Sequence, residues 1–178
     1  MILNVLKGAY PSLQQISKDL LIAADAVFER GSILVQDTTT SGTDSITTWK
    51  VSEAGDSASA KIAYFALQDH NDYQAKMAGT LSSTAGYAPK VSALSCTMPM
   101  EIETDMFDGD VKPGDYLMVG AGGKLVKHTT GKTAVLQVTK APYVRWCNNA
   151  DASGEPNFRQ GTNVTVIRGT TVFLPGLA

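Results

Sequence analysis

The sequence predicts a mainly β fold, and three observations support that prediction. After Arg30, apolar and β-branched residues recur with a period of two, which is the period of a strand with one buried face. Clusters of Gly, Ser, Thr, Asp and Asn separate these runs at short intervals. The middle and the end of the chain lack the helical patterns that parallel β-α-β units require. Together they indicate small antiparallel β-barrel or sandwich domains with an N-terminal arm and little helix.

Eleven runs have the strand pattern. They are residues 32–36, 46–52, 61–68, 91–96, 101–104, 115–119, 124–128, 134–139, 143–147, 163–168 and 171–174. The segments between them are rich in turn formers, for example TTTSGTDS, EAGDSAS, FDGD, GAGG and NNADASGEPN. Short strands at this spacing are typical of antiparallel sheets joined by tight turns.

Residues 12–28 form the one convincing helical candidate. Leu13, Ile16, Leu20 and Ala24 lie three or four residues apart, which places them on one helical face. Ser12 follows a proline and can cap the first turn. We therefore expect residues 1–28 to form an N-terminal arm with a short helix, and residues 29–178 to form the β domain.

Two segments of the β domain resemble one another. Residues 29–35, ERGSILV, and residues 112–119, KPGDYLMV, each place a glycine and a small polar residue before an apolar strand. A glycine-containing turn and an alternating strand follow in both places, and then a longer strand, IAYFAL or AVLQV. The echo indicates either an old duplication, with related motifs at about 29–95 and 96–178, or simply two β-hairpins.

Composition excludes several functional classes. The 178 residues carry a net charge of -2, so no global basic field attracts nucleic acid or an anionic membrane. Charged residues make up only 18% of the chain, and a surface of small uncharged residues suits burial against another protein. The N-terminus lacks the pattern of a signal peptide, no stretch has the length of a membrane span, and Cys96 and Cys147 do not make a disulfide framework. We expect folding in cytoplasm.

The stretch DGDVKPGDYLMVGAGGKLVKH, residues 108–128, raises the question of a ligand site. Val126 stands where a phosphate-binding P-loop needs its first glycine, and Leu125 stands where the dinucleotide fingerprint needs its last one. The acids between Asp105 and Asp115 lack the spacing of a calcium-binding loop, and aspartates beside glycine usually form turns. We interpret the stretch as two strands joined by a two-residue turn, with positive φ at Gly122 and Gly123.

Catalysis has no better support. The chain lacks the GxSxG pattern of a nucleophile elbow, and its two histidines, His70 and His128, are too few for a convincing zinc site. The sequence leaves open whether a cysteine meets a histidine in space. We expect no enzyme activity, no metal, no cofactor and no small-molecule substrate.

The segments ERGSILVQD, TTWKVSE, KIAYFALQD and VKPGDYLMVGAGGKLVKH, followed by TAVLQVTKAP, resemble the capsid decoration (cement) proteins of tailed bacteriophages. The resemblance covers about residues 29–142. It implies a virion structural protein on the capsid surface, assembled in the host cytoplasm, that bridges subunits of the major capsid protein and forms a homotrimer. It implies no nucleic-acid or membrane partner.

Four aromatic residues are the predicted protein-contact positions: Trp146, Tyr143, Phe158 and Tyr10. Aromatic side chains are enriched at the centres of protein interfaces. Trp49 is a weaker candidate, because its place in an alternating strand favours the core. Two other functions stay open, namely a tail-tube or other tail structural subunit and a metal- or carbohydrate-binding β domain.

Overall fold

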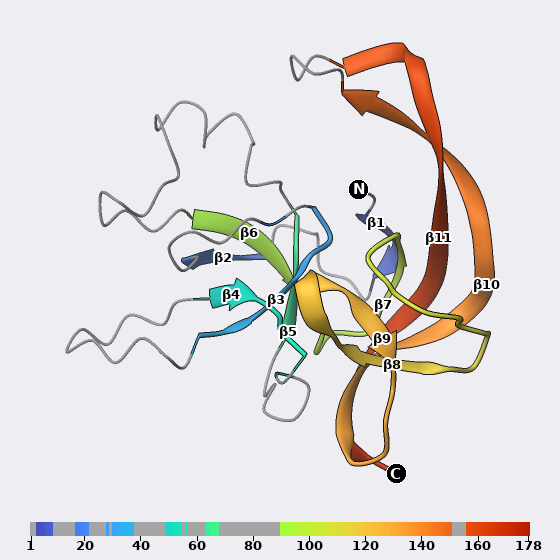
Figure 1. Cartoon of the computed structure of the whole chain (residues 1–178). Coiled ribbons are helices and arrows are strands. Elements are labelled where there is room, and N and C mark those ends of the chain that lie inside the picture. The colour runs from blue at the N-terminus through green and yellow to red at the C-terminus, as the bar shows by residue number, and fades with distance from the viewer. Residues whose placement is uncertain are drawn as a thin grey trace.

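The computed structural model describes residues 3–8, 17–21, 28, 30–37, 49–54, 56, 63–67, 90–150 and 156–178. These residues form two antiparallel sheets (Figure 1). Sheet A contains β1 (Leu3–Gly8), β7 (Met100–Thr104), β8 (Tyr116–Val119), β9 (Leu125–Lys127), β10 (Lys132–Ala150) and β11 (Pro156–Leu177). Sheet B contains β2 (Ser17–Leu21), β3 (Ile33–Gln36), β4 (Trp49–Val51), β5 (Ala63–Ala66) and β6 (Lys90–Ser95).

The mainly β prediction is confirmed. Every strand pairing is antiparallel, and helical structure among the described residues is limited to short 3-10 pieces such as Ala121–Gly123. The described strands do not close into a barrel, because each sheet has a linear strand order with two edges. The architecture is therefore sandwich-like. Among the described residues, no helix has the length and apolar character that a membrane span needs.

The predicted helix at 12–28 is wrong where the structure describes it. Residues Ser17–Leu21 form β2, which pairs with β6 from Ser17 opposite Leu94 to Leu21 opposite Lys90. A spacing of three and four fits a short helix, but pairing with a neighbouring strand overrides so weak a local preference. The rest of the predicted N-terminal arm that is described, Leu3–Gly8, is an edge strand on β7.

Seven predicted strands of the β domain match β3 to β9, and four others merge into two long strands. The runs 134–139 and 143–147 are both parts of β10, and the runs 163–168 and 171–174 are both parts of β11. A register shift between Lys140 and Tyr143 coincides with the gap between the two predicted runs of β10, so the alternation is interrupted there although the strand continues.

The two sheets repeat one strand arrangement. Sheet B has the order β2-β6-β5-β3-β4. Adding five to each strand number gives β7-β11-β10-β8-β9, which is the order of sheet A without its edge strand β1. The backbone bonds at the segments that resemble each other in sequence are also the same. Gly31 donates to Ala66 at 2.7 Å and Gly114 donates to Val138 at 2.8 Å, and both glycines have a φ of 92°.

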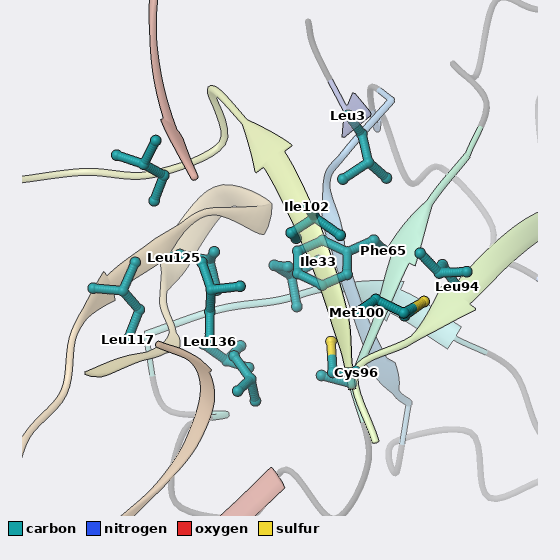
Figure 2. Packing of buried hydrophobic residues seen from close by; sticks show 14 of the residues in the cluster. Leu3, Ile33, Phe65, Leu94, Cys96, Met100, Ile102, Leu117, Leu125 and Leu136 are labelled. Atoms are coloured by element: carbon teal, nitrogen blue, oxygen red, sulfur yellow. The ribbon is translucent and has the colours of Figure 1, made fainter. Parts of the chain in front are cut away.

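The main core lies between the two sheets (Figure 2). Figure 2 shows side chains from both sheets pointing toward one another. The cluster includes Ile33, Val35, Phe65, Leu94 and Cys96 from the sheet B half and Leu3, Met100, Ile102, Leu117, Val119, Leu125, Leu136, Val138 and Ile167 from sheet A. Burying each large aliphatic side chain of this kind stabilises the fold by about 1.5–3 kcal/mol.

The inner strands β3 and β5 of sheet B are buried on both faces. A second cluster on the other face of sheet B contains Phe28, Leu34, Tyr64, Ala66 and Ala93. For this reason the runs ILV and AYFA read as continuous apolar sequence and do not alternate. Trp49 packs at the margin of this cluster, edge-on to Tyr64 with the ring centroids 4.8 Å apart, which agrees with the core interpretation.

The turn between β8 and β9 joins the two sheets. Positive φ is confirmed at Gly122 and Gly123, but the two-residue turn is wrong, because five residues connect Val119 to Leu125. Ser52, which follows β4, donates its hydroxyl to the Gly120 carbonyl at 2.7 Å, and Gly123 donates to the Ser52 carbonyl at 3.3 Å. The glycines of this stretch therefore shape an inter-sheet contact.

Candidate protein-contact site

The long hairpin of β10 and β11 extends beyond the rest of sheet A. β8 pairs with β10 only from Ala134 to Gln137, and β7 pairs with β11 only from Ile167 to Thr170. In the part of the chain that the structure describes, residues 140–150 and 156–166 pair only with each other. Figure 1 shows this pair, hereafter the ribbon, as a curved arm that reaches away from both sheets.

A buried carboxylate on β7 holds the base of the ribbon. Glu103 is fully buried, but not in the main core. It follows the core residue Ile102 in sequence and therefore points to the face of β7 opposite to that core. Its oxygens accept hydrogen bonds from the Tyr143 hydroxyl and from the Arg145 guanidinium, which both come from β10. A buried charge must be paired and hydrogen-bonded to persist, and these two donors meet that requirement.

Two further charges complete the base. Arg168 of β11 lies 4.0 Å from Glu103 and 3.8 Å from Glu101. The Lys140 ammonium lies 4.1 Å from the centre of the Tyr143 ring, within the range of a cation–π contact. Burial raises the pKa of Tyr143, and its hydrogen bond to Glu103 raises it further. The phenol is therefore held in its protonated, donating form.

At this base the ribbon exposes one apolar side chain on the face away from Glu103. Val144 is 62% exposed, and its neighbour across the ribbon, Thr165, is exposed and uncharged. On the other face, Val166 is fully buried opposite Tyr143. A two-stranded hairpin is only marginally stable in water, and it gains stability when another surface covers it. The arrangement suits docking to a second protein.

Of the four predicted contact residues, Tyr143 is the one whose side chain the structure describes. Tyr143 is half-buried at the base of the ribbon, where its hydroxyl anchors the ribbon to Glu103. Trp146 belongs to β10 and Phe158 belongs to β11. The structure describes their backbone, and their side chains fall outside the described part. Tyr10 lies outside the described residues. The contact role of these four residues stays a prediction.

Sequence reasoning missed Glu103, Arg145 and Arg168. The signal that could have found Glu103 is the segment MEIET, in which two glutamates alternate with apolar residues of the core. That alternation places both glutamates on the face away from the core, but it does not say what covers them. The partners of Glu103 are 40 and 42 residues away, so no local pattern identifies them.

The acids of residues 105–115 serve as turn formers where the structure gives their bonds. Asp108 accepts from the Gly109 amide at 2.9 Å, and Asp115 accepts from the Lys112 amide and the Lys127 ammonium, both at 3.0 Å. The hydrogen bond from Lys127 lowers the pKa of Asp115, and the Lys112 amide lowers it further. No group of three His, Cys, Asp or Glu suited to a metal ion occurs among the described residues.

Of the candidate nucleophiles and bases, Cys147 belongs to β10 within the ribbon, but its side chain falls outside the described part, whereas Cys96 and His128 lie outside the ribbon. Cys96 is a free thiol, fully buried in the main core, and burial raises its pKa well above the ordinary value. Such a thiol is a poor nucleophile, because the reactive form is the thiolate. A ring nitrogen of His128 lies 3.1 Å from the Lys132 carbonyl oxygen, and His70 lies outside the described residues.

Comparisons with protein-family models, with curated proteins and with solved structures gave no match. A function for this protein must therefore be inferred from its sequence, its fold, the ribbon and the charged residues at the base of the ribbon.

Proposed function

We propose that this protein is a virion structural protein that binds the outer surface of a phage capsid and stabilises it by bridging capsid subunits. The observation that carries the proposal is the ribbon, a two-stranded arm that Glu103 holds at its base and that exposes Val144 on its other face. An arm of this kind gains stability from a partner surface, because a hairpin without a third strand or a packed face is marginal.

The segments that resemble decoration proteins have matching roles in the fold. ERGSILVQD contains Gly31 and β3, and VKPGDYLMV contains Gly114 and β8, so each supplies a glycine with positive φ before a buried strand. GGKL forms the end of the inter-sheet turn and the start of β9, and TAVLQV lies within β10. The capsid-surface function itself is what the resemblance of these segments implies.

The partner proposed here is the major capsid protein, with a homotrimer of this chain as the binding unit. Low charge content supports a protein partner, because charged residues are depleted at the centres of interfaces. Tyr143, Trp146, Phe158 and Tyr10 are the proposed anchors, since a few aromatic residues dominate the binding energy of most interfaces. No catalytic step forms part of this function.

The proposal is tested by binding to capsids that lack this protein. Purified chain is mixed with expanded capsids, the capsids are sedimented, and the bound chain is measured. We expect saturable binding, and we expect Val144→Asp and Trp146→Ala to weaken it while Thr130→Asp, an exposed turn substitution, leaves it unchanged. A wild-type chain that stays in the supernatant at every concentration overturns the proposal.

A second candidate, a tail-tube or other tail structural subunit, is favoured by the same ribbon. Residues 140–150 and 156–166 extend from sheet A as an arm (Figure 1) that could contact a neighbouring copy in a ring. Negative-stain microscopy separates the two functions. Rings or tubes formed by the isolated protein favour the tail role, and discrete particles that decorate capsids favour the capsid role.

A further inference from the structure

The connection from β7 to β8 contains a reactive dipeptide. Asp108–Gly109 is the one place in the sequence where an aspartate is followed by glycine, and no asparagine in the sequence is followed by glycine. Both residues of the pair are exposed. The side-chain carboxyl of an aspartate can react with the amide of the next residue. Glycine hinders that reaction least, because it has no side chain beside the amide nitrogen.

The turn brings the two reacting groups together. The Gly109 amide donates a hydrogen bond to Oδ1 of Asp108 at 2.9 Å, so the amide nitrogen lies beside the carboxyl group of the preceding side chain. Gly109 has a φ of 86°, a left-handed conformation that glycine adopts freely. A Cβ built on Gly109 would meet no atom within 4 Å, so open space surrounds the pair. The nitrogen and the carboxyl carbon can therefore approach one another by rotation of an exposed side chain.

Two neighbouring aspartates lack this arrangement. Asp110 precedes Val111, a β-branched residue that is buried in the main core and crowds the amide nitrogen between them. The carboxylate of Asp115 accepts from the Lys112 amide and from the Lys127 ammonium, both at 3.0 Å, and these bonds hold it in place. Asp110 and Asp115 are therefore internal controls for the reactivity of Asp108.

We propose that Asp108 is a site of spontaneous isomerisation, at which the folded chain converts aspartate to isoaspartate through a succinimide. The Gly109 nitrogen attacks the carboxyl carbon of Asp108 and loses its proton, and the carboxyl group loses its hydroxyl, so one water leaves as the ring closes. Water then adds at the former main-chain carbonyl, and the bond from that carbon to the Gly109 nitrogen breaks. The main chain now runs through the side-chain carboxyl carbon. The inference is independent of the proposed function.

Isomerisation lengthens the backbone by one methylene between two fixed points. The Asp108 amide donates to the Leu125 carbonyl at 2.8 Å, and the Leu125 amide donates to the Met106 carbonyl at 2.9 Å. On the other side of the site, Val111 is buried in the main core. Because residues 108–110 are exposed, the added length extends the turn into solvent. The reaction also frees an α-carboxylate at residue 108, which an enzyme that methylates isoaspartate can reach.

The test measures isoaspartate in the folded protein. Purified chain is incubated at neutral pH and physiological temperature, and an isoaspartyl methyltransferase then transfers methyl groups to it from labelled S-adenosylmethionine. We expect the label to increase with incubation time and to map to Asp108 by mass spectrometry of the digested chain, with a fraction of that peptide lacking one water. Asp108→Glu should abolish this labelling, because its longer side chain does not close the same ring. Asp110→Glu should leave it unchanged.

The same incubation in urea separates the effect of the turn from that of the dipeptide. Because the turn holds the reacting groups together, the folded chain should convert at least as fast as the unfolded chain. Conversion in the unfolded chain alone, or in neither state, overturns the inference, and so does label at Asp110 or Asp115 in place of Asp108. Circular dichroism identifies a variant that fails to fold, and the wild-type peptide map then provides the result.

Discussion

Arg145 of β10 and Glu103 of β7 form an ion pair across 42 residues of sequence, and the carboxylate of that pair is fully buried. The pair ties the arm of the molecule to the sheet from which it extends. Because Glu103 also accepts from Tyr143, one carboxylate fixes two residues of the same strand on one face. The direction of the ribbon therefore depends on a single side chain of β7.

Removing this carboxylate should destabilise the protein. Glu103→Gln removes the charge that Arg145 and Arg168 share, and we expect the free energy of unfolding to fall by about 2 kcal/mol, because the bonds from Tyr143 and Arg145 to an ionised carboxylate become weaker bonds to a neutral amide. The matched control is Glu101→Gln, two residues away on the same face. Its carboxylate is 24% exposed and 3.8 Å from Arg168, so about 0.5 kcal/mol or less is expected. Equal losses in urea denaturation would contradict the assigned role of Glu103.

The hydrogen bond of Tyr143 should give a pH-dependent contribution to stability. Its pKa is raised above the ordinary 10.0 by burial and by Glu103, so the folded state holds the phenol proton more tightly than the unfolded state. The stabilisation is complete below the unfolded pKa and is lost as pH rises through the folded pKa. The difference in unfolding free energy between wild type and Tyr143→Phe should therefore shrink above about pH 10. A difference that stays constant through this range would show that the phenol is not held in this way.

Two adjacent glycines separate backbone strain from inter-sheet packing. Gly122 and Gly123 have φ of 65° and 72°, so alanine at either position costs about 1–2 kcal/mol. A Cβ at Gly122 meets no atom within 4 Å, whereas a Cβ at Gly123 would lie 2.9 Å from the Cβ of Ser32 in the segment that leads into β3. We expect Gly123→Ala to cost about 1–3 kcal/mol more than Gly122→Ala in chemical denaturation. Equal costs would mean that the turn does not press on the sheet B half.

The thiol of Cys96 should be inert in the folded protein. It is fully buried, and burial raises its pKa, so the thiolate is scarce at neutral pH. In a Cys147→Ser background, labelling by a thiol reagent should occur only as fast as the protein unfolds. Fast, complete labelling under native conditions would place Cys96 in a reactive site.

Chelation should leave the protein unchanged. The carboxylates of Asp108 and Asp115 already accept protein hydrogen bonds, and the described residues hold no metal-type cluster. A cation bound to the native state would raise the melting temperature by mass action. We therefore expect the same melting temperature in calcium and in EDTA, and a rise in calcium would support the metal-binding alternative.

Many of the strands can be predicted from local sequence, because burial on one or both faces of a strand determines where its apolar residues occur. β3 and β5 could be predicted from their apolar residues, and β8 and β9 from alternation around a glycine turn. β1 and β2 could not be predicted in this way. The segments LNVLKG and SKDLL are short and fit a helical spacing equally well, and they become strands because β7 and β6 offer them edges.

In the candidate protein-contact site, sequence could predict only a residue whose own type indicates a contact role. Tyr143 stands out as an aromatic residue in a strand, whereas Glu103 gains its meaning from partners far away in the sequence. The internal echo indicated that two segments are alike, and the corresponding hydrogen bonds of Gly31 and Gly114 extend that likeness to whole sheets. Register between distant strands is a tertiary property, so local pattern alone does not fix it.

The most direct measurement of the central claim, that this chain coats a phage capsid, is its number of copies in purified particles from the source of the sequence, determined by quantitative mass spectrometry against the major capsid protein. A protein that coats the shell should be present in a fixed ratio to that subunit, with hundreds of copies in each particle. A handful of copies, or none, would contradict the account.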